Sequence, residues 1–267
     1  MKPEKTLNIA VLVVSCDNYA DLWRPFFKLF KRFWADCPFP VYLLSNELKG
    51  DFTDINNITV GKDISWSDSL KTGLLQINAE YVLMVIDDLF FTGPVNTERL
   101  MVVCDEFIKV QGNYLRLNPT VKADMPYNEH FGLVSKGSYY RTSTVFSLWK
   151  KNILMDLLKS GESPWEFEVF GTVRSDAYGD FYSTLTHFFP NVNGVIKGKW
   201  QRSAIKRLQK LGIKLELDTR KTMKLRETMR FYFILMRFKA LQLFPPGYRR
   251  YIKDLLSGGQ CRYSLKK

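Results

Sequence analysis

The sequence predicts an α/β fold in which helices flank a mainly parallel sheet, followed by a basic, helical C-terminal extension. Short apolar runs rich in β-branched residues alternate with amphipathic segments, which is the pattern of strand–helix–strand units. The runs are apolar throughout, as strands buried on both faces are. Basic residues are concentrated in helical segments beyond residue 200. With 267 residues, the chain is long enough to bury a substantial core.

The first strand–helix–strand unit lies at the N-terminal end. LNIAVLVVS at 7–15 predicts a buried strand, and residues 19–34 predict a helix because their large apolar side chains recur at helical spacing. Asp17 or Asn18 is the expected N-cap of that helix. The prolines of CPFP end it, and PVYLLSNE at 40–47 predicts a second buried strand.

The segments that follow repeat this alternation, which implies a mainly parallel sheet. The further expected strands are 55–60, 81–88 and NYLRL. The further expected helices are 65–77, 97–110, 146–160, a helix that opens at Pro164, and roughly 175–187. The Gly-, Tyr- and Ser-rich stretch 126–144 predicts functional loops or short strands.

The net charge of +12 is unevenly distributed. Residues 197–267 contain 20 Lys or Arg and 4 Asp or Glu, a net charge of +16, so the rest of the chain carries −4. We therefore expect two parts, a sheet domain over residues 1–198 and a basic amphipathic helical extension over 199–267.

Cysteine and histidine are too sparse for a transition-metal site of nitrogen and sulfur ligands. The two histidines, His130 and His187, are far apart, and the four cysteines form no close pairs. Any bound metal should therefore be hard and held by oxygen, and unpaired cysteines fit a reducing cytosol. The start of the chain lacks the pattern of a cleaved signal peptide, and no apolar run approaches the ~20 residues of a spanning helix. We expect a soluble or peripheral protein.

Several catalytic motifs are missing from the sequence. It has no G-x-G-x-x-G after the first strand, no G-x-x-x-x-G-K-S/T and no G-x-S-x-G. A dinucleotide oxidoreductase, a P-loop enzyme and a Ser-His-Asp hydrolase are therefore disfavoured.

Two adjacent carboxylates, Asp87 and Asp88 in VIDDLFF, end the strand predicted at 81–88. Open α/β sheets bind ligands at the carboxyl ends of their strands. One carboxylate can bind Mn²⁺ or Mg²⁺ directly while the other acts through water or reaches a ribose, and substrate phosphates complete the metal's shell. This arrangement suits a nucleoside diphosphate. In the alternative interpretation, Asp87 or Asp88 only caps the next turn.

The loop after the first strand, SCDNYADLW, should border the nucleotide. The loop begins at Ser15. The Asp17 carboxylate can accept a hydrogen bond from the base or ribose, and the Tyr19 ring can stack on the base. Alternatively, Asp17 is a helix cap and Tyr19 a hydrophobic staple. SWSDSL leaves the same choice, because Trp66 and Asp68 can face the ligand while its serines can simply cap a helix.

The stretch SPWEFE contains two candidates for a general base. A group transfer with inversion needs one carboxylate to take the proton of the acceptor hydroxyl, and Glu166 and Glu168 are available. Ser163 to Glu166 fits a capping box, so Glu168 is the preferred base. Trp165 can be a stacking platform for an acceptor sugar ring, or it can be buried on its helix.

The order of these segments resembles that of bacterial glycosyltransferases of the GT-A type, which build capsule or lipopolysaccharide O-antigen. The segments lie between residue 7 and about 172 and are SCDNYADLW with PFPVYLLSNE, SWSDSL, YVLMVIDDLFF, SLWKKNIL and SPWEFEVFG. The resemblance implies a Rossmann-type, GT-A-like catalytic domain in a cytoplasmic hexosyltransferase. Such an enzyme uses a nucleotide sugar, often a UDP sugar, with Mn²⁺ or Mg²⁺, and an acceptor carried on a polyprenyl diphosphate or lipid core.

The resemblance also implies roles for individual residues. Asp88 matches the metal ligand of the family's D-x-D-like motif, Asp87 its neighbour toward the ribose, and Glu168 the base on the acceptor side. This chain has I-D-D where many relatives have D-x-D, which leaves the metal ligand open between Asp87 and Asp88.

The basic tail joins Arg and Lys to apolar residues, as in MRFYFILMRFKALQLF, which suits a helix on the anionic inner face of the cytoplasmic membrane. Alternatively, the helix packs on the sheet domain with a solvated basic face. No recognition motif accompanies the charge, so no nucleic-acid partner is expected. Two other functions stay open: a nucleotidyltransferase with a triphosphate donor, and a basic nucleic-acid- or membrane-binding module without catalysis.

Overall fold

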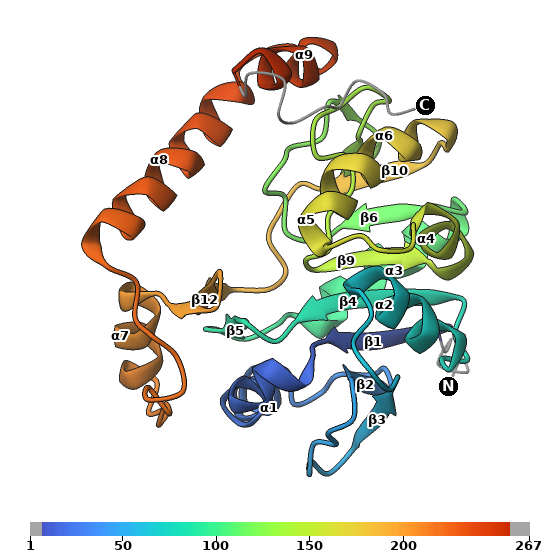
Figure 1. Ribbon diagram of the computed structural model, residues 1–267. Helices are drawn as coiled ribbons and strands as arrows, with labels where there is room; N and C mark the ends of the chain where they lie inside the picture. The colour runs from blue at the N-terminus through green and yellow to red at the C-terminus, as the bar shows by residue number, and fades with distance from the viewer. Residues whose placement is uncertain (1–6, 257–267) are drawn as a thin grey trace.

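The computed structural model describes residues 7–256, which form an α/β structure around one large sheet (Figure 1). Within these residues the sheet has nine strands, in the order β3 (Ile55–Thr59), β2 (Val41–Ser45), β1 (Ile9–Val14), β4 (Tyr81–Ile86), β9 (Ser147–Lys150), β6 (Tyr114–Arg116), β10 (Phe181–Thr184), β8 (Phe131–Leu133) and β7 (Met125–Pro126). β3, β2, β1 and β4 are parallel neighbours, β9 is antiparallel to both β4 and β6, and β10 is parallel to β6. The sheet is mainly parallel, which confirms the predicted fold class.

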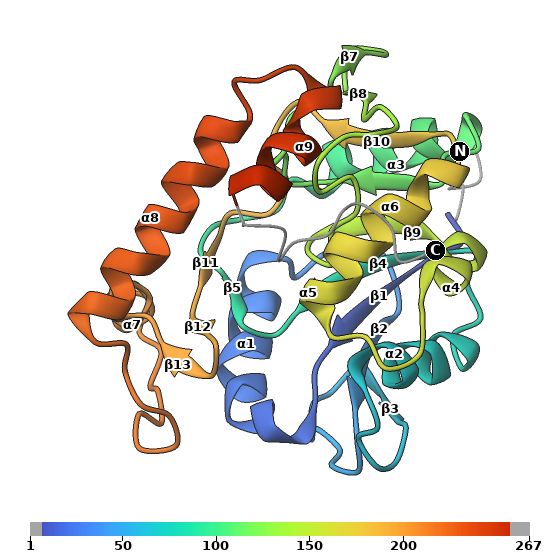
Figure 2. The same cartoon turned by 45° about the horizontal axis from the view of Figure 1, so that its top comes forward.

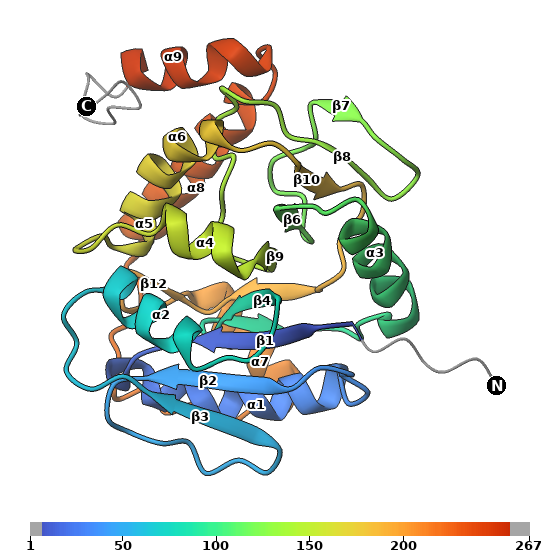
Figure 3. The same cartoon turned by 90° about the vertical axis from the view of Figure 1, so that its right-hand side faces the viewer.

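Helices cover both faces of this sheet (Figure 3). On one face α1 (Ala20–Phe33), α3 (Thr97–Lys109) and α7 (Arg202–Lys210) pack into the core that contains Val11 and Val13 of β1. On the other face α2 (Trp66–Leu75) and α4 (Lys151–Leu157) pack over Leu12 and Val14. The same face is covered by a continuous helical stretch made of α5 (Pro164–Glu166), the π-helical η2 (Phe167–Gly171), α6 (Thr172–Arg174) and η3 (Ser175–Ala177). Because successive strand residues point to opposite faces, β1 must be apolar throughout.

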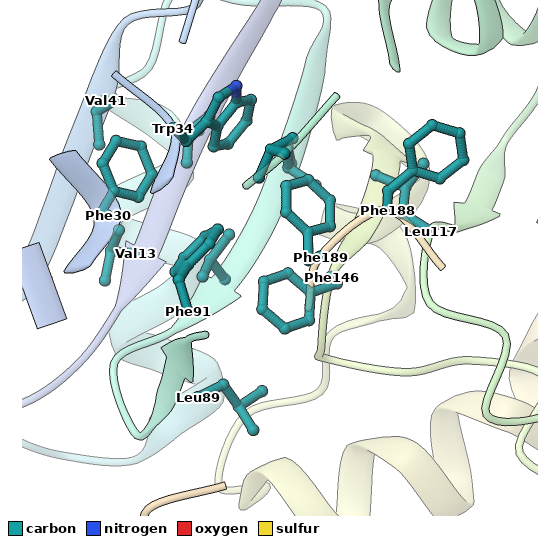
Figure 4. Close-up of a cluster of buried hydrophobic side chains, with 14 of the residues drawn as sticks. Val13, Phe30, Trp34, Val41, Leu89, Phe91, Leu117, Phe146, Phe188 and Phe189 are labelled. Atoms are coloured by element: carbon teal, nitrogen blue, oxygen red, sulfur yellow. The ribbon is translucent and has the colours of Figure 1, made fainter. Parts of the chain in front are cut away.

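Smaller elements follow the ends of the strands. They are the 3-10 helix η1 (Asp17–Tyr19), the paired strands β5 (Leu89–Phe91) and β11 (Asn191–Asn193), and the paired strands β12 (Val195–Ile196) and β13 (Lys199–Trp200). Figure 4 shows the aromatic core beside β5. Phe91 packs edge-on against Phe146 and Phe189 at centroid distances of 5.8 and 5.9 Å, and it also contacts Phe30 and Trp34. These contacts fix the strand that directly follows the two adjacent aspartates.

The C-terminal extension has two differently packed parts. Trp200, Leu208 and Ile213 are buried in the same core as β1. Beyond them, α8 (Leu225–Leu241) crosses from the region of α7 to α9 (Pro246–Leu256), standing off the sheet (Figures 1 and 2). Within residues 7–256 no helix is both long and apolar enough to cross a membrane. Residues 257–267 of the predicted extension lie outside the described residues.

Most expected elements are confirmed, including the strands at 7–15, 40–47, 55–60 and 81–88 and the helices at 19–34, 65–77 and 97–110. The helix predicted over 146–160 is wrong in its first part, because Ser147–Lys150 forms β9. The neighbours β4 and β6 supply backbone partners to this strand and bury its apolar side chains.

The helix predicted over roughly 175–187 is also wrong. Only η3 is helical there, and Phe181–Thr184 forms β10, which pairs with β6 and β8. Partners far away in the sequence decided both cases, and helical periodicity does not report on such partners.

Candidate active site

The parallel pairing of β1 and β4 brings two of the predicted ligand loops together. Val14 lies opposite Ile86 in the register of the two strands, so Ser15 and Asp87 follow at the same edge of the sheet. The Ser15 hydroxyl donates a hydrogen bond to Asp87 Oδ2 at 2.5 Å and accepts one from Trp23 Nε1 at 2.6 Å. Strand register therefore fixes the position of the Asp87 carboxylate.

A cavity of about 940 Å³ lies at this edge of the sheet. Its lining includes seven of the residues predicted from the sequence, namely Ser15, Tyr19, Trp66, Asp87, Asp88, Trp165 and Glu168. Cavities of ~300–1,000 Å³ are typical of small-molecule and cofactor sites. The predicted residues Asp17, Asp68 and Glu166 do not line this cavity.

Asp87 and Asp88 form a pair of like charges on the cavity wall. Asp87 is 1% exposed. Burial, and after it the neighbouring Asp88 carboxylate, raises the pKa of Asp87 well above its ordinary value, and the Ser15 hydrogen bond opposes this shift. Burial raises the pKa of Asp88 to about 7, against the hydrogen bond to its backbone and the charge of Arg220. A bound cation would relieve the cost of holding both charges here.

The pair has the donor atoms that a hard divalent cation requires. Within residues 7–256 no cluster of three or more His, Cys, Asp or Glu side chains is suited to hold a metal. A divalent ion held by one or two carboxylates takes its remaining ligands from water and substrate phosphates. Mn²⁺ or Mg²⁺ bound together with a nucleoside diphosphate fits these residues.

Asp17 holds two loops together. Its carboxylate accepts hydrogen bonds from the backbone N–H groups of Asn46, Glu47 and Leu48 at 3.0–3.2 Å, which ties the loop after β2 to the loop after β1. The predicted helix cap by Asp17 or Asn18 is wrong, because α1 begins after Tyr19 and has no side-chain cap.

Tyr19 lies between the cavity and the C-terminal extension. The Arg220 guanidinium lies over the Tyr19 ring, 4.2 Å from its centroid. Arg220 is itself held by an ion pair with Asp21 at 2.7 Å and by the backbone oxygen of Asn18. The charge of Arg220 also lowers the pKa of the carboxylates in the pair. Sequence reasoning missed Arg220, because this contact spans about two hundred residues of chain.

The residues of SWSDSL divide between helix capping and the cavity. Ser65 caps α2 by accepting from Asp68 N at 3.1 Å. The Asp68 carboxylate accepts from Ser65, from Ser160 Oγ at 3.0 Å and from Gly161 N at 3.1 Å, so it joins α2 to the loop before α5. Trp66 lines the cavity.

Glu166 and Glu168 also have different surroundings. Glu166 completes a capping box with Ser163. Glu168 Oε1 accepts from Thr144 N at 2.9 Å, from Thr144 Oγ1 at 3.0 Å and from Ser143 Oγ at 3.2 Å. Burial raises the pKa of Glu168, and these hydrogen bonds and the charge of Arg116 oppose the shift. Trp165, next to Glu166, is 62% exposed and lines the cavity.

Arg116 is a second residue that sequence reasoning missed. It is 1% exposed, lines the cavity, and donates to Val121 O and Tyr140 O. Its Nε has no hydrogen-bond partner within the described chain. The signal for it was the single charged residue in the apolar strand NYLRL.

Comparison with known proteins gives distant structural similarities only. No family model matches the chain, and no curated protein gives a sequence match to it. A fragment of S. aureus TarS has 11% identity and a TM-score of 0.49, covering 69% of this chain and 60% of the fragment, which is less than two thirds. The same fragment in complex with UDP-GlcNAc has 13% identity and a TM-score of 0.47, covering 69% of this chain and 58% of the fragment. UTP-bound UGPase from Acinetobacter baumannii has 8% identity and a TM-score of 0.48, covering 86% of this chain and 99% of the UGPase.

Proposed function

We propose that this protein is a metal-dependent glycosyltransferase. It moves a sugar from a nucleotide-sugar donor, a UDP sugar in the first instance, to a glycan or lipid-linked acceptor in the synthesis of bacterial surface polysaccharide. One observation carries most of the proposal: a single cavity is lined both by the adjacent carboxylates Asp87 and Asp88 and by a separate carboxylate, Glu168.

The donor half of the proposal uses the pair and the loop after β1. A Mn²⁺ or Mg²⁺ ion held by the pair would neutralise charge on the departing nucleoside diphosphate. The Ser15 hydroxyl orients Asp87. Tyr19 offers the nucleotide base a ring that Arg220 holds in place. Trp66 bounds the same cavity.

The acceptor half uses Glu168 and Trp165. Glu168 takes the proton from the acceptor hydroxyl, whose oxygen then bonds to the anomeric carbon as the bond to the diphosphate oxygen breaks. Its hydrogen bonds to Thr144 and Ser143 orient the carboxylate. The exposed Trp165 ring supplies an apolar face for a sugar of the acceptor. Attack from the side opposite the leaving group inverts the anomeric centre.

Donor binding tests this proposal first. Thermal-shift and calorimetric titrations with UDP and UDP sugars should show binding that requires Mn²⁺, because a ligand of the folded state raises its stability. Asp88→Ala should weaken this binding by about 10–100-fold or more. Asp36→Ala, which removes an exposed carboxylate just after α1, is the matched control and should bind normally.

Two results would contradict the proposal. The first is the absence of metal-dependent nucleotide binding, or binding that Asp88→Ala leaves unchanged. The second is release of pyrophosphate from a nucleoside triphosphate and a sugar phosphate, which would identify a nucleotidyltransferase.

A further inference from the structure

The helix α8 has apolar side chains on two opposite faces. Its inner face contributes Phe231, Ile234, Leu235 and Leu241 to the lining of the cavity. Its outer face carries an apolar stripe, defined here as Leu225, Met229, Tyr232 and Met236, which are 71, 64, 47 and 67% exposed. Their spacing of four, three and four residues places them on one side of a helix.

The apolar stripe is exposed in the structure although its side chains are large. α8 is tied to the rest of the protein near its two ends, by the ion pair of Glu227 with Lys199 and by the hydrogen bond of Gln242 to Thr120 O. Between these points it stands off the sheet (Figures 1 and 2). An exposed apolar stripe of this length marks a surface for interaction.

A basic row runs beside the apolar stripe. Arg226 and Arg230 each follow a residue of the stripe by one position, so they lie along one flank of it. Both are exposed, whereas Arg237 lines the cavity and donates to the backbone oxygen of Leu256 at 3.3 Å. The single acidic residue in α8, Glu227, is paired with Lys199. The outer face of α8 is therefore apolar and cationic.

The same character continues into α9. Tyr248, Tyr251 and Leu255 are 64, 67 and 68% exposed and lie at helical spacing. Two arginines on the opposite side anchor α9 to the protein body, through the ion pairs Arg249–Asp124 and Arg250–Asp176. The exposed side of α9 is thus held in a fixed place at the end of α8.

We propose that the outer face of α8, continued by α9, docks on an anionic lipid membrane surface. Aromatic and aliphatic side chains enter the boundary between headgroups and acyl chains, while arginines on the flank pair with lipid phosphates. A second copy of the chain is the weaker occupant, because two such faces would bring basic rows together without an acidic row to meet them. Membrane docking is separate from the proposed donor chemistry, and a binding measurement tests it without any sugar transfer.

Vesicle co-sedimentation of the full chain tests the proposal. The protein should bind vesicles that contain phosphatidylglycerol and bind pure phosphatidylcholine vesicles much more weakly. Arg226→Ala with Arg230→Ala should lower the partition coefficient about 30-fold, since each basic residue near an anionic surface contributes about fivefold. Lys206→Ala with Lys210→Ala is the matched control, because these exposed lysines lie on α7, outside this surface. It should bind like the wild type.

The apolar part of the surface needs its own variant. Met229→Gln with Met236→Gln keeps side-chain length and should lower binding about tenfold or more, with an unchanged unfolding midpoint because both residues are exposed. If the lysine variant on α7 lost as much vesicle binding as the arginine variant on α8, the proposal would be overturned in favour of unspecific charge attraction. The proposal would also be overturned if the protein did not bind vesicles but formed a dimer in sedimentation that the methionine variant abolished. In that case the outer face would bind a second copy of the chain.

Discussion

Glu166 and Glu168 are two positions apart and meet different surroundings. Glu166 closes the capping box at the start of α5, where its carboxylate accepts from the backbone and hydroxyl of Ser163. Glu168 turns to the loop at 143–144 and to the cavity. The capping box predicted for Glu166 is confirmed, because a capping box depends only on local spacing.

Glu168→Gln should therefore lower the rate of sugar transfer by about 10²–10⁴-fold, the usual contribution of a general base, and leave the dissociation constant of the donor unchanged. Steady-state kinetics and titration with UDP separate the two effects. A transfer rate equal to that of the wild type would show that Glu168 is not the base.

The raised pKa of Glu168 predicts a pH dependence of stability. The folded protein holds this proton more tightly than the unfolded chain does. The stabilising effect is present in full below the ordinary glutamate pKa and is lost as the pH rises through the raised value. Denaturant unfolding should thus show the free energy of unfolding of wild type falling in this window, with a smaller fall for Glu168→Gln. Equal slopes in the two proteins would contradict the assignment of the shift to Glu168.

The candidate site also shows which residues a sequence can reveal. Asp87 and Asp88 follow an apolar strand, and the rule for strand ends places them at the ligand edge. Arg116 and Arg220 reach the same region through contacts that only the tertiary structure creates. Asp17 and Asp68 were open between two roles, and their hydrogen bonds are to loops that lie far away in sequence.

At the scale of elements, local signals and partner-dependent signals gave different results. The helix α2 was predictable because Ser65 is a strong N-cap. β9 was not, because its four residues are followed at once by α4 and their strand state depends on β4 and β6. Helix caps are encoded within a few residues, whereas strand pairing is encoded across the chain.

Ser163→Ala tests how far the start of α5 acts independently of the donor site. Loss of the cap should lower the free energy of unfolding by about 1 kcal/mol. UDP binding with Mn²⁺ should be unchanged, since the residues proposed for the donor lie on other elements. A large loss of UDP binding in a variant that remains folded would instead couple α5 to the donor site.

At the scale of the whole molecule, the C-terminal extension divides near residue 223. Before this point, Trp200 and Leu208 belong to the main core and Arg220 contacts Tyr19. After it, α8 and α9 form the arm that carries the apolar stripe. Charge distribution alone marked the basic region but not this division, because burial of Trp200 is invisible in a count of charges.

Two truncations test this division. A chain that ends at residue 198 should fail to unfold cooperatively, because loss of a buried Trp side chain alone costs about 3–5 kcal/mol. A chain that ends at residue 223 should fold and bind UDP with Mn²⁺ but lose vesicle binding. A stable, cooperative chain of residues 1–198 would mean that the extension contributes little to the core.

The two faces of α8 have a geometric consequence for the acceptor. A helix with its side chains is about 10–12 Å across. With its inner face over the cavity and its outer face on the membrane proposed above, α8 would set the height of the cavity above the bilayer. A glycosyltransferase of the kind proposed, held at that height, would search for its acceptor in two dimensions and would favour hydroxyl groups on short glycans close to the lipid over those at the far ends of long chains.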